Sequence, residues 1–298
     1  MPAEARTGES GEHSSFIIEH SSLSIEHSTF RNMKSLLFLF FLLLAGCAMQ
    51  EEHPPLTDLT PIILERNGTE WFQYWEIPNG DYLWQTDDLG QIDALQAYRD
   101  SVQADLGEAF TGYLEAQSIQ HPASDTVLIP GGVNPDSLLA AKQGDGDRYN
   151  YDIIHYKEVG EVRPINYLEA QILNYQLDRY PLFSHPTEFH GFILTNDSLD
   201  RVRVYYAASD APWPPKPKPV VAAVEQDLQQ GWELTIHLHN HYEPAEDGYL
   251  GTMAPSMSDA QYFKGLSERF RGKAAHITNG FHTVVLPPET YGKFAAYQ

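Results

Sequence analysis

The sequence predicts an α/β domain in which helices flank a mixed β-sheet, preceded by a smaller N-terminal α+β module. From residue 164 onward, segments with helical and strand periodicity follow in the order helix, strand, strand, helix, strand, helix, strand, strand. Such alternation is typical of layered α/β domains. Between residues 62 and 118, hairpin signals come before one long amphipathic segment. The 298 residues, 12% of them aromatic, also carry enough apolar side chains for a sizeable core.

The N-terminal module, residues 48–160, is expected to contain a hairpin and a helix. After a polar tether, short apolar runs between residues 62 and 84 are separated by Asn67-Gly68 and Asn79-Gly80. Because Asn-Gly pairs favour tight turns, these runs predict two or three strands. Residues 90–118 predict an amphipathic helix, broken near Gly107, since apolar side chains recur there every three or four residues. Residues 130–150 are rich in Gly and Asp and predict a loop.

The C-terminal domain, residues 161–298, is expected to hold the mixed sheet. A helix over 164–180 would begin at Pro164, since proline is favoured in a first helical turn. Strands are expected over 186–196 and 201–208, joined by a polar turn, and a helix over 221–231 follows a proline-rich segment. The prediction ends with a strand over 232–241, a helix over 258–270 and a hairpin over 275–287.

The strand over 232–241 carries a repeated histidine pattern. Because side chains alternate between the two faces of a strand, its apolar residues are expected on one face and its polar residues on the other. The apolar face would hold Trp232, Leu234, Ile236 and Leu238, and the polar face Glu233, Thr235, His237, His239 and His241.

These histidines can form part of a metal site. Imidazole is the commonest metal ligand in proteins, and residues i and i+2 of a strand direct two rings at one point. Asp259, at the start of the next helix, can add a carboxylate and leave one position open for water. A simpler interpretation also fits: a polar strand face, and a helix start capped by Ser256 or Ser258 with Asp259 in its first turn.

Residues 33–47 resemble a bacterial lipoprotein signal. Lys34 precedes an unbroken apolar run that is too short to span a bilayer, and the run ends in Leu44-Ala45-Gly46-Cys47. This ending is similar to the lipobox, whose cysteine is lipidated and becomes the first residue. We therefore expect Met33 as the start, removal of residues 1–46, and a lipid anchor at Cys47. The mature protein is expected in the bacterial cell envelope, either periplasmic or surface-exposed, with the choice of inner or outer membrane left open.

Composition excludes several classes of function. Cys47 is the single cysteine, so the lipidated protein has none for a disulfide or a thiolate metal site. Removing residues 1–46 takes three of the 19 basic and five of the 41 acidic residues and leaves a net charge of −20. Such a field repels phosphate backbones, so nucleic acid is not an expected partner. The sequence also has no HExxH, no G-x-S-x-G and no phosphate-binding P-loop.

The order of motifs within residues 164–290 resembles the JAMM (MPN-type, JAB-domain) zinc metalloproteases. That family has a glutamate followed three residues later by glycine and an apolar run, then His-Ser/Thr-His-Pro, then Ser-x-x-Asp. The matching segments here are Glu188 to Leu194, His239-Asn240-His241-Tyr242, and Ser256 to Asp259.

The resemblance implies a layered fold similar to that of cytidine deaminases. It also implies zinc-dependent hydrolysis of an amide or isopeptide bond in a peptide or protein substrate. His239, His241 and Asp259 would hold Zn²⁺, Glu188 would act as the general base, and Ser256 would donate a hydrogen bond to the developing oxyanion.

The chain departs from the family pattern at several points. Asn240 stands where the family has Ser or Thr, Tyr242 stands where it has Pro, and the loop that leads to Asp259 is longer. The extra histidine, His237, leaves two ligand pairs open, 237/239 and 239/241, of which the strand length favours the second. A catalytically inactive scaffold or binding lipoprotein is the alternative function, and the sequence does not name a substrate.

Overall fold

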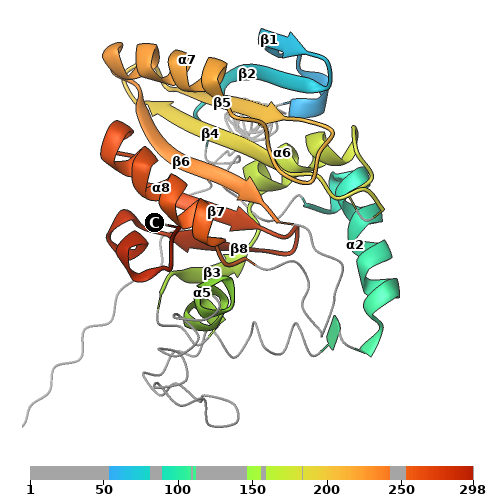
Figure 1. The fold of residues 1–298 in the computed structure, drawn as a ribbon. Helices are drawn as coiled ribbons and strands as arrows, with labels where there is room; N and C mark the ends of the chain where they lie inside the picture. Colours follow the sequence, from blue (N-terminus) through green and yellow to red (C-terminus); the bar gives the residue numbers. More distant parts are fainter. Residues whose placement is uncertain are drawn as a thin grey trace, which may run out of the picture. The chain divides into compact units, whose positions relative to one another are not determined.

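The computed structural model describes residues 54–80, 89–108, 110–111, 146–155, 159–182, 184–241 and 253–297. Residues Pro54–Gln298 form one compact unit. Its centre is an eight-stranded mixed sheet with flanking helices, as the sequence predicts (Figure 1). Within the described part of the chain, no helix is long and apolar enough to cross a membrane. The predicted leader, the lipobox and Cys47 lie outside the described residues.

The sheet has the strand order β1-β2-β5-β4-β6-β7-β8-β3. Neighbouring strands are antiparallel except for β6 and β7, which run parallel. In chain order the strands are β1 (Ile62–Asn67), β2 (Glu70–Pro78), β3 (Glu161–Pro164), β4 (Phe189–Asn196), β5 (Arg201–Ala208), β6 (Glu233–Asn240), β7 (Ala274–Thr278) and β8 (His282–Leu286). The parallel pair requires a crossover, which the helix between β6 and β7 provides.

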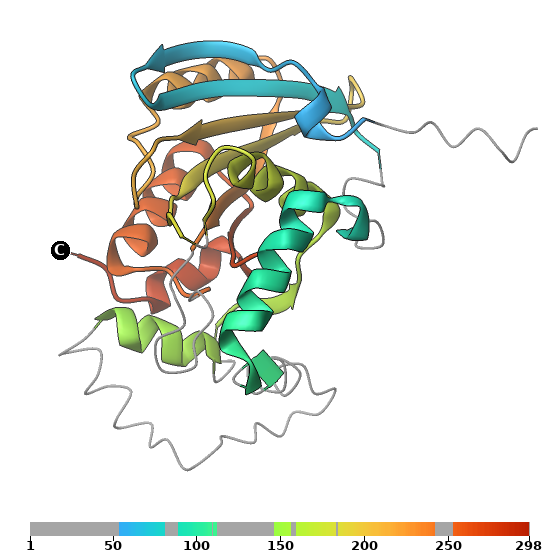
Figure 2. The same cartoon turned by 90° about the vertical axis from the view of Figure 1, so that its right-hand side faces the viewer.

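Helices cover both faces of this sheet. α7 (Lys218–Gln229) and α8 (Met257–Phe270) lie over the face toward the viewer in Figure 1, and α2 (Asp93–Leu106) and α6 (Tyr167–Leu177) lie on the opposite side (Figure 2). A fifth helix, α5 (Gly146–His155), packs near β3 and the C-terminal turn. Short 3₁₀ turns complete the described elements: η1 (Leu56–Asp58), η3 (Leu89–Gln91) and η4 (Pro288–Lys293).

Buried apolar side chains form a core on each side of the sheet. On the α2 and α6 side, Leu95 and Ile172 pack with Ile193 and Tyr206. On the α7 and α8 side, the cluster includes Phe192, Leu194, Val224 and Phe270. A third cluster joins α5, α8, β7, β8 and η4. The sheet is therefore buried on both faces over its central strands, which fixes the strand end that carries the histidines.

The predicted N-terminal hairpin and helix are present. β1 and β2 meet at Gly68, whose φ of +59° suits a tight turn, and α2 ends at Gly107 with φ +54°. These elements do not form a separate module, however. β2 pairs with β5 from Trp71↔Ala208 to Pro78↔Arg201, so the sheet continues across the boundary that the sequence places at 160/161. Strand pairing between distant segments cannot be recognised from local sequence, which explains why the sequence suggested a separate module.

The predicted start of the helix over 164–180 is wrong. Pro164 is the last residue of β3, where it pairs with His282. The helix begins after Asn166, whose side chain accepts from the Glu169 backbone N–H while the Glu169 carboxylate accepts from the Asn166 backbone N–H. This reciprocal capping box satisfies two backbone donors and sets the helix start better than a proline does. The predicted loop over 130–150 is also partly helical, since α5 begins at Gly146.

The predicted division of strand 232–241 into an apolar and a polar face is also wrong. Ile193 of β4 pairs with Ile236, but the next residue, Leu194, pairs with Leu234, so Thr235 forms a β-bulge. An extra residue shifts the alternation by one position. Leu234 therefore packs on the α7 and α8 side, whereas Ile236 packs on the α2 and α6 side. Beyond the bulge, the histidines share the α8 side with Leu234.

Candidate metal centre

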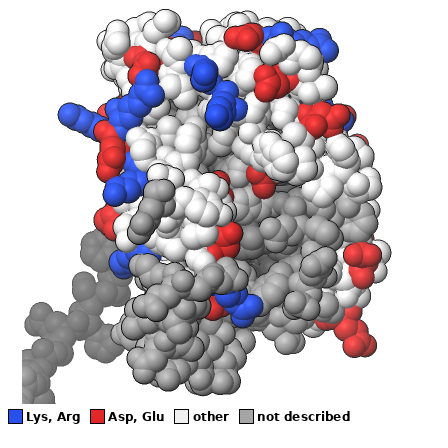
Figure 3. Space-filling model, in the orientation of Figure 1, with Lys and Arg blue, Asp and Glu red and all other residues white. Residues whose placement is uncertain are grey.

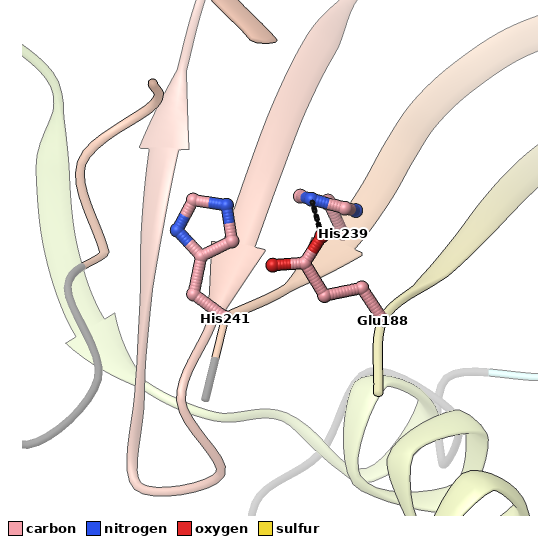
Figure 4. Close-up of side chains that lie close together, drawn as sticks. All are labelled: Glu188, His239 and His241. Carbon is pink, nitrogen blue, oxygen red and sulfur yellow. Dashed lines mark ion pairs between the residues drawn. The ribbon is translucent and has the colours of Figure 1, made fainter. Parts of the chain in front are cut away.

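Four side chains from three separate elements converge at one end of the sheet. Glu188 immediately precedes β4, His239 lies near the end of β6, and His241 follows that strand. Asp259 is in the first turn of α8, which begins over the same end of the sheet. Figure 4 shows Glu188 pointing toward the two imidazole rings from the start of β4. The sequence predicted these four residues, and the structure brings them together.

The distances between their ligand atoms are short. Glu188 Oε2 lies 3.4 Å from His239 Nε2, and Asp259 Oδ2 lies 3.2 Å from His241 Nε2. Asp259 Oδ1 is 3.9 Å from His239 Nε2. One ligand atom from each of Glu188, His239 and His241 fits within 4.8 Å of the others, close enough for these residues to hold a metal ion.

The backbone of β4 sets the tautomer of His239. His239 Nδ1 lies 2.8 Å from the Phe189 carbonyl oxygen, and because that oxygen can only accept, Nδ1 must donate. In a neutral ring, Nε2 then carries the lone pair, and it is Nε2 that faces Glu188 and Asp259. A ligating histidine in proteins is held in the same way, through its other nitrogen.

Asp259 both caps the start of α8 and faces the candidate histidine ligands, so it combines the two interpretations that the sequence left open. Its carboxylate Oδ2 accepts from the backbone N–H of Ser256 at 3.0 Å, while the Ser256 Oγ accepts from the Asp259 backbone N–H at 3.2 Å. This is a complete capping box, and the same carboxylate faces His239 and His241. Burial raises the pKa of Asp259, but the hydrogen bond from His241 and the two histidine charges hold that pKa well below its usual range. The helix cap therefore keeps an ionised carboxylate against the rings.

The hydroxyl of Ser256 is already engaged within this cap. Ser256 Oγ donates to Asp259 Oδ2 at 2.8 Å and also lies 2.8 Å from Ser258 Oγ. A hydroxyl has one hydrogen to donate, so a Ser256 that holds Asp259 has none left for an oxyanion. In this arrangement Ser256 orients a carboxylate rather than facing the site directly.

The donor types and their spacing allow this cluster to hold a metal ion. Two ligand atoms that share a zinc ion at about 2.0–2.1 Å lie roughly 3.3 Å apart in tetrahedral geometry. The 3.2 Å between His241 Nε2 and Asp259 Oδ2 is near that value, and the 3.9 Å between His239 Nε2 and Asp259 Oδ1 is longer. Imidazole nitrogen and carboxylate oxygen are donors that zinc accepts. The donor set therefore fits a metal ion such as zinc.

His237 lies behind this cluster instead of within it. Its Nε2 is 3.1 Å from Nδ1 of His190, and His190 stacks on His239 with ring centroids 5.4 Å apart. Burial lowers the pKa of His237 to about 3 and brings the pKa of His190 well below its usual value, so both rings are neutral. The arrangement favours the 239/241 pair, with His190 stacked on His239 and His237 in contact with His190.

Two other histidines, His185 and His276, lie apart from the cluster. His185 is exposed and bonded to Asp210. His276 is buried next to Glu169, with Nδ1 2.7 Å from Oε1. Arg163 and Thr283 donate to the same carboxylate, so this network consolidates β3, β7, β8 and α6. Neither histidine contributes to the ligand set.

The site opens to the surface next to a groove. In Figure 3, acidic side chains lie in the recess near the middle of the face that carries α7 and α8. A groove of about 470 Å³ runs between these helices and includes Ser258, the neighbour of Asp259. The remaining lining is largely apolar and comes from Val221, Gln261, Tyr262, Gly265, Leu266, Arg269 and Phe270.

Asn240 is the site residue whose importance sequence reasoning missed. It entered the comparison of motifs only as a replacement for Ser or Thr, yet its side chain is buried and bonded to the backbone on both sides of Glu188. By the period-two alternation, Asn240 falls on the face predicted to hold Leu234, Ile236 and Leu238, and a polar residue at that position was the available signal.

Comparisons of this chain with models of protein families, with curated proteins and with solved structures find no match.

Proposed function

We propose that this chain is a zinc-dependent metallopeptidase of the JAMM type that hydrolyses an amide or isopeptide bond in the bacterial cell envelope. The observation that carries the proposal is the convergence of Glu188, His239, His241 and Asp259 from three elements. Imidazoles and carboxylates that meet from distant parts of a chain in a half-buried recess are candidates for a functional site. Their order along the chain is the one in the family that the motifs resemble.

His239, His241 and Asp259 would hold the ion, because Asp259 lies within 3.9 Å of both imidazoles. When bound, Zn²⁺ supplies a Lewis acid that lowers the pKa of water and polarises a carbonyl group. Glu188 is left as the second carboxylate, with a side chain 24% exposed. A carboxylate that remains accessible to substrate and solvent beside the ligands is suited to proton transfer.

Glu188 acts as general base and then as general acid. Its Oε2 removes a proton from the water as the water oxygen forms a bond to the amide carbon. When the carbon–nitrogen bond breaks, the same carboxyl group returns that proton to the leaving nitrogen, so that an amine and a carboxylic acid are released. Ser256 keeps Asp259 oriented through the cap rather than binding the oxyanion.

The expected setting of this reaction follows from the sequence. The lipobox-like ending at Cys47 supports a lipid-anchored protein outside the cytoplasm, and the net charge of −22 for the whole chain disfavours nucleic acid. A peptide or protein substrate is the remaining macromolecular class with amide bonds. The groove beside Ser258 gives room for such a chain.

The test is a comparison of metal content and turnover in the purified mature protein. We expect about one zinc per chain by elemental analysis, and cleavage of members of a library of quenched fluorescent peptides. Glu188→Gln should keep the zinc and lose about 10²–10⁴-fold in turnover, because it removes the proton acceptor alone. His241→Ala is the contrasting variant and should lose the metal.

Two outcomes would refute the proposal. A Glu188→Gln variant with zinc and full wild-type turnover would refute the base assignment. A wild-type protein that neither contains zinc nor takes it up would refute the enzyme and favour a binding lipoprotein or scaffold.

A further inference from the structure

Asn240 makes two hydrogen bonds that bracket Glu188. Its Oδ1 accepts from the Phe189 backbone N–H at 2.8 Å, and its Nδ2 donates to the Thr187 carbonyl oxygen at 2.9 Å. The side chain is 1% exposed, so both bonds are shielded from water. The peptide groups on either side of Glu188 are thus tied to the residue that separates His239 from His241.

These bonds continue the sheet beyond its backbone pairing. The β4–β6 ladder has His190↔His239 as its last pair toward the site, so residues 188 and 189 have no backbone partner on β6. A side-chain amide offers one donor and one acceptor, as a peptide group does. Asn240 therefore takes the place of the next ladder position, and His239 Nδ1 holds the Phe189 carbonyl oxygen beside it.

The other side of this segment is anchored as well. Thr187 Oγ1 accepts from Gln176 Nε2 of α6 at 2.6 Å, and Gln176 Oε1 bonds the Tyr206 hydroxyl. Thr187 and Gln176 are both fully buried. With its main chain fixed from β6 and from α6, Glu188 retains freedom mainly in its own side-chain torsions.

We infer that Asn240 is a positioning residue that holds Glu188 against the two imidazoles by clamping the backbone on both sides of it. The inference rests on the proposed function, since it takes Glu188 as the general base. An error of about 1 Å in the position of a catalytic group can cost about 10²-fold in rate. The amide suits this clamp because the hydroxyl of Ser or Thr is shorter and has a single hydrogen to donate.

Asn240→Asp tests the clamp with almost no change in shape. The aspartate keeps an acceptor for the Phe189 N–H but directs an oxygen at the Thr187 carbonyl oxygen, which repels it. We expect kcat on the quenched fluorescent peptides to fall at least 10-fold, while KM and the zinc affinity, measured by competition with a chelator, change less than threefold. Asn196→Asp is the matched control, because Asn196 is buried at the other end of β4 and its Oδ1 accepts from Leu199 N–H.

The decisive measurement repeats Asn240→Asp in a Glu188→Gln background. A residue that acts through Glu188 has nothing left to position there, so we expect no further loss of the residual rate. A loss of the same size in both backgrounds would overturn the inference, as would an Asn196→Asp control with an equal loss.

Hydrogen exchange provides a readout that does not depend on turnover. The Phe189 amide should be protected in the wild type and in Asn240→Asp, which keeps its acceptor, and exposed in Asn240→Leu, which does not. An unprotected Phe189 amide in the wild type would refute the clamp itself. A wild type without zinc or turnover would refute the proposed function together with this role, whereas full turnover in Asn240→Asp would refute this role alone.

Discussion

Glu169 shows how a single buried charge contributes to this fold. The carboxylate is fully buried and receives hydrogen bonds from Arg163, Thr283 and the Asn166 backbone, with His276 Nδ1 at 2.7 Å. Burial raises its pKa, but His276 and Arg163 overcome this effect and bring the pKa to about 2, from 4.5 for an isolated group. The folded state therefore favours the ionised form.

This shift predicts how stability depends on pH. A folded-state pKa below the unfolded value contributes stability that is complete above pH 4.5 and is lost as pH falls toward 2. The difference of these values corresponds to about 3 kcal/mol. Urea unfolding should therefore show the stability difference between the wild type and Glu169→Gln decreasing by about that amount from pH 7 to pH 2. A gap that stays constant over this range would contradict the assignment of the stabilisation to ionised Glu169.

At the scale of one helix, α8 contains a glycine whose replacement should increase the stability of the protein. Gly265 is exposed in the middle of the helix, and a Cβ built on it meets nothing within 4 Å. Glycine in a helix interior costs about 0.5–1 kcal/mol relative to alanine. We expect Gly265→Ala to raise the free energy of unfolding by about that amount and the melting temperature by roughly 1–4 °C.

Gly280 is the contrasting position, in the turn between β7 and β8. Its φ is +88°, and a Cβ there would lie 2.7 Å from Cε1 of Tyr98. Gly280→Ala should lower the free energy of unfolding by more than about 1 kcal/mol, because backbone strain and a steric overlap act together. Calorimetry of both variants checks the pair, and shifts of the same sign would show that the local backbone environments have been misjudged.

The elements that the sequence could predict are those whose cause is local. Asn67-Gly68 indicated the first hairpin and Gly107 the end of α2, since turn and helix ends depend on neighbouring residues. The bulge at Thr235 could not be predicted, because it arises from the pairing of β6 with β4. For the same reason, no local pattern indicates that β2 joins the sheet beside β5, or that Pro164 pairs with His282.

The residues of the candidate site also divide into those that could be predicted from local sequence and those that could not. Glu188, His239, His241 and Asp259 could be predicted, because imidazoles and carboxylates are the residue types of a metal site and their order resembles the JAMM motif pattern. The choice between His237 and His241 depended on where β6 ends, and the role of Asn240 depended on a segment 51 residues away in the chain. Only the folded arrangement supplies those facts.

For the whole molecule, metal binding should appear as a gain in stability. A ligand that binds the folded state alone stabilises it by about 2.7 kcal/mol at 100 times its dissociation constant. We expect zinc to raise the melting temperature of the metal-stripped protein by roughly 5–10 °C, and to leave the His239→Ala variant unchanged. Magnesium, which prefers oxygen ligands, serves as the control cation. An equal rise in His239→Ala would place the bound zinc elsewhere on the protein.

The position of β6 in the sheet has a consequence for how an ion enters and leaves. β6 lies between β4 and β7 and is hydrogen-bonded on both edges, so its backbone opens only when the sheet opens. Asp259, by contrast, sits in the first turn of a helix, where local opening breaks the capping box with Ser256 but leaves the sheet intact. The two imidazoles therefore keep their positions when this helix end opens, and the carboxylate of Asp259 moves with the helix end. Exchange of the ion is then expected to follow the rate at which one helix end opens, many times faster than the protein unfolds.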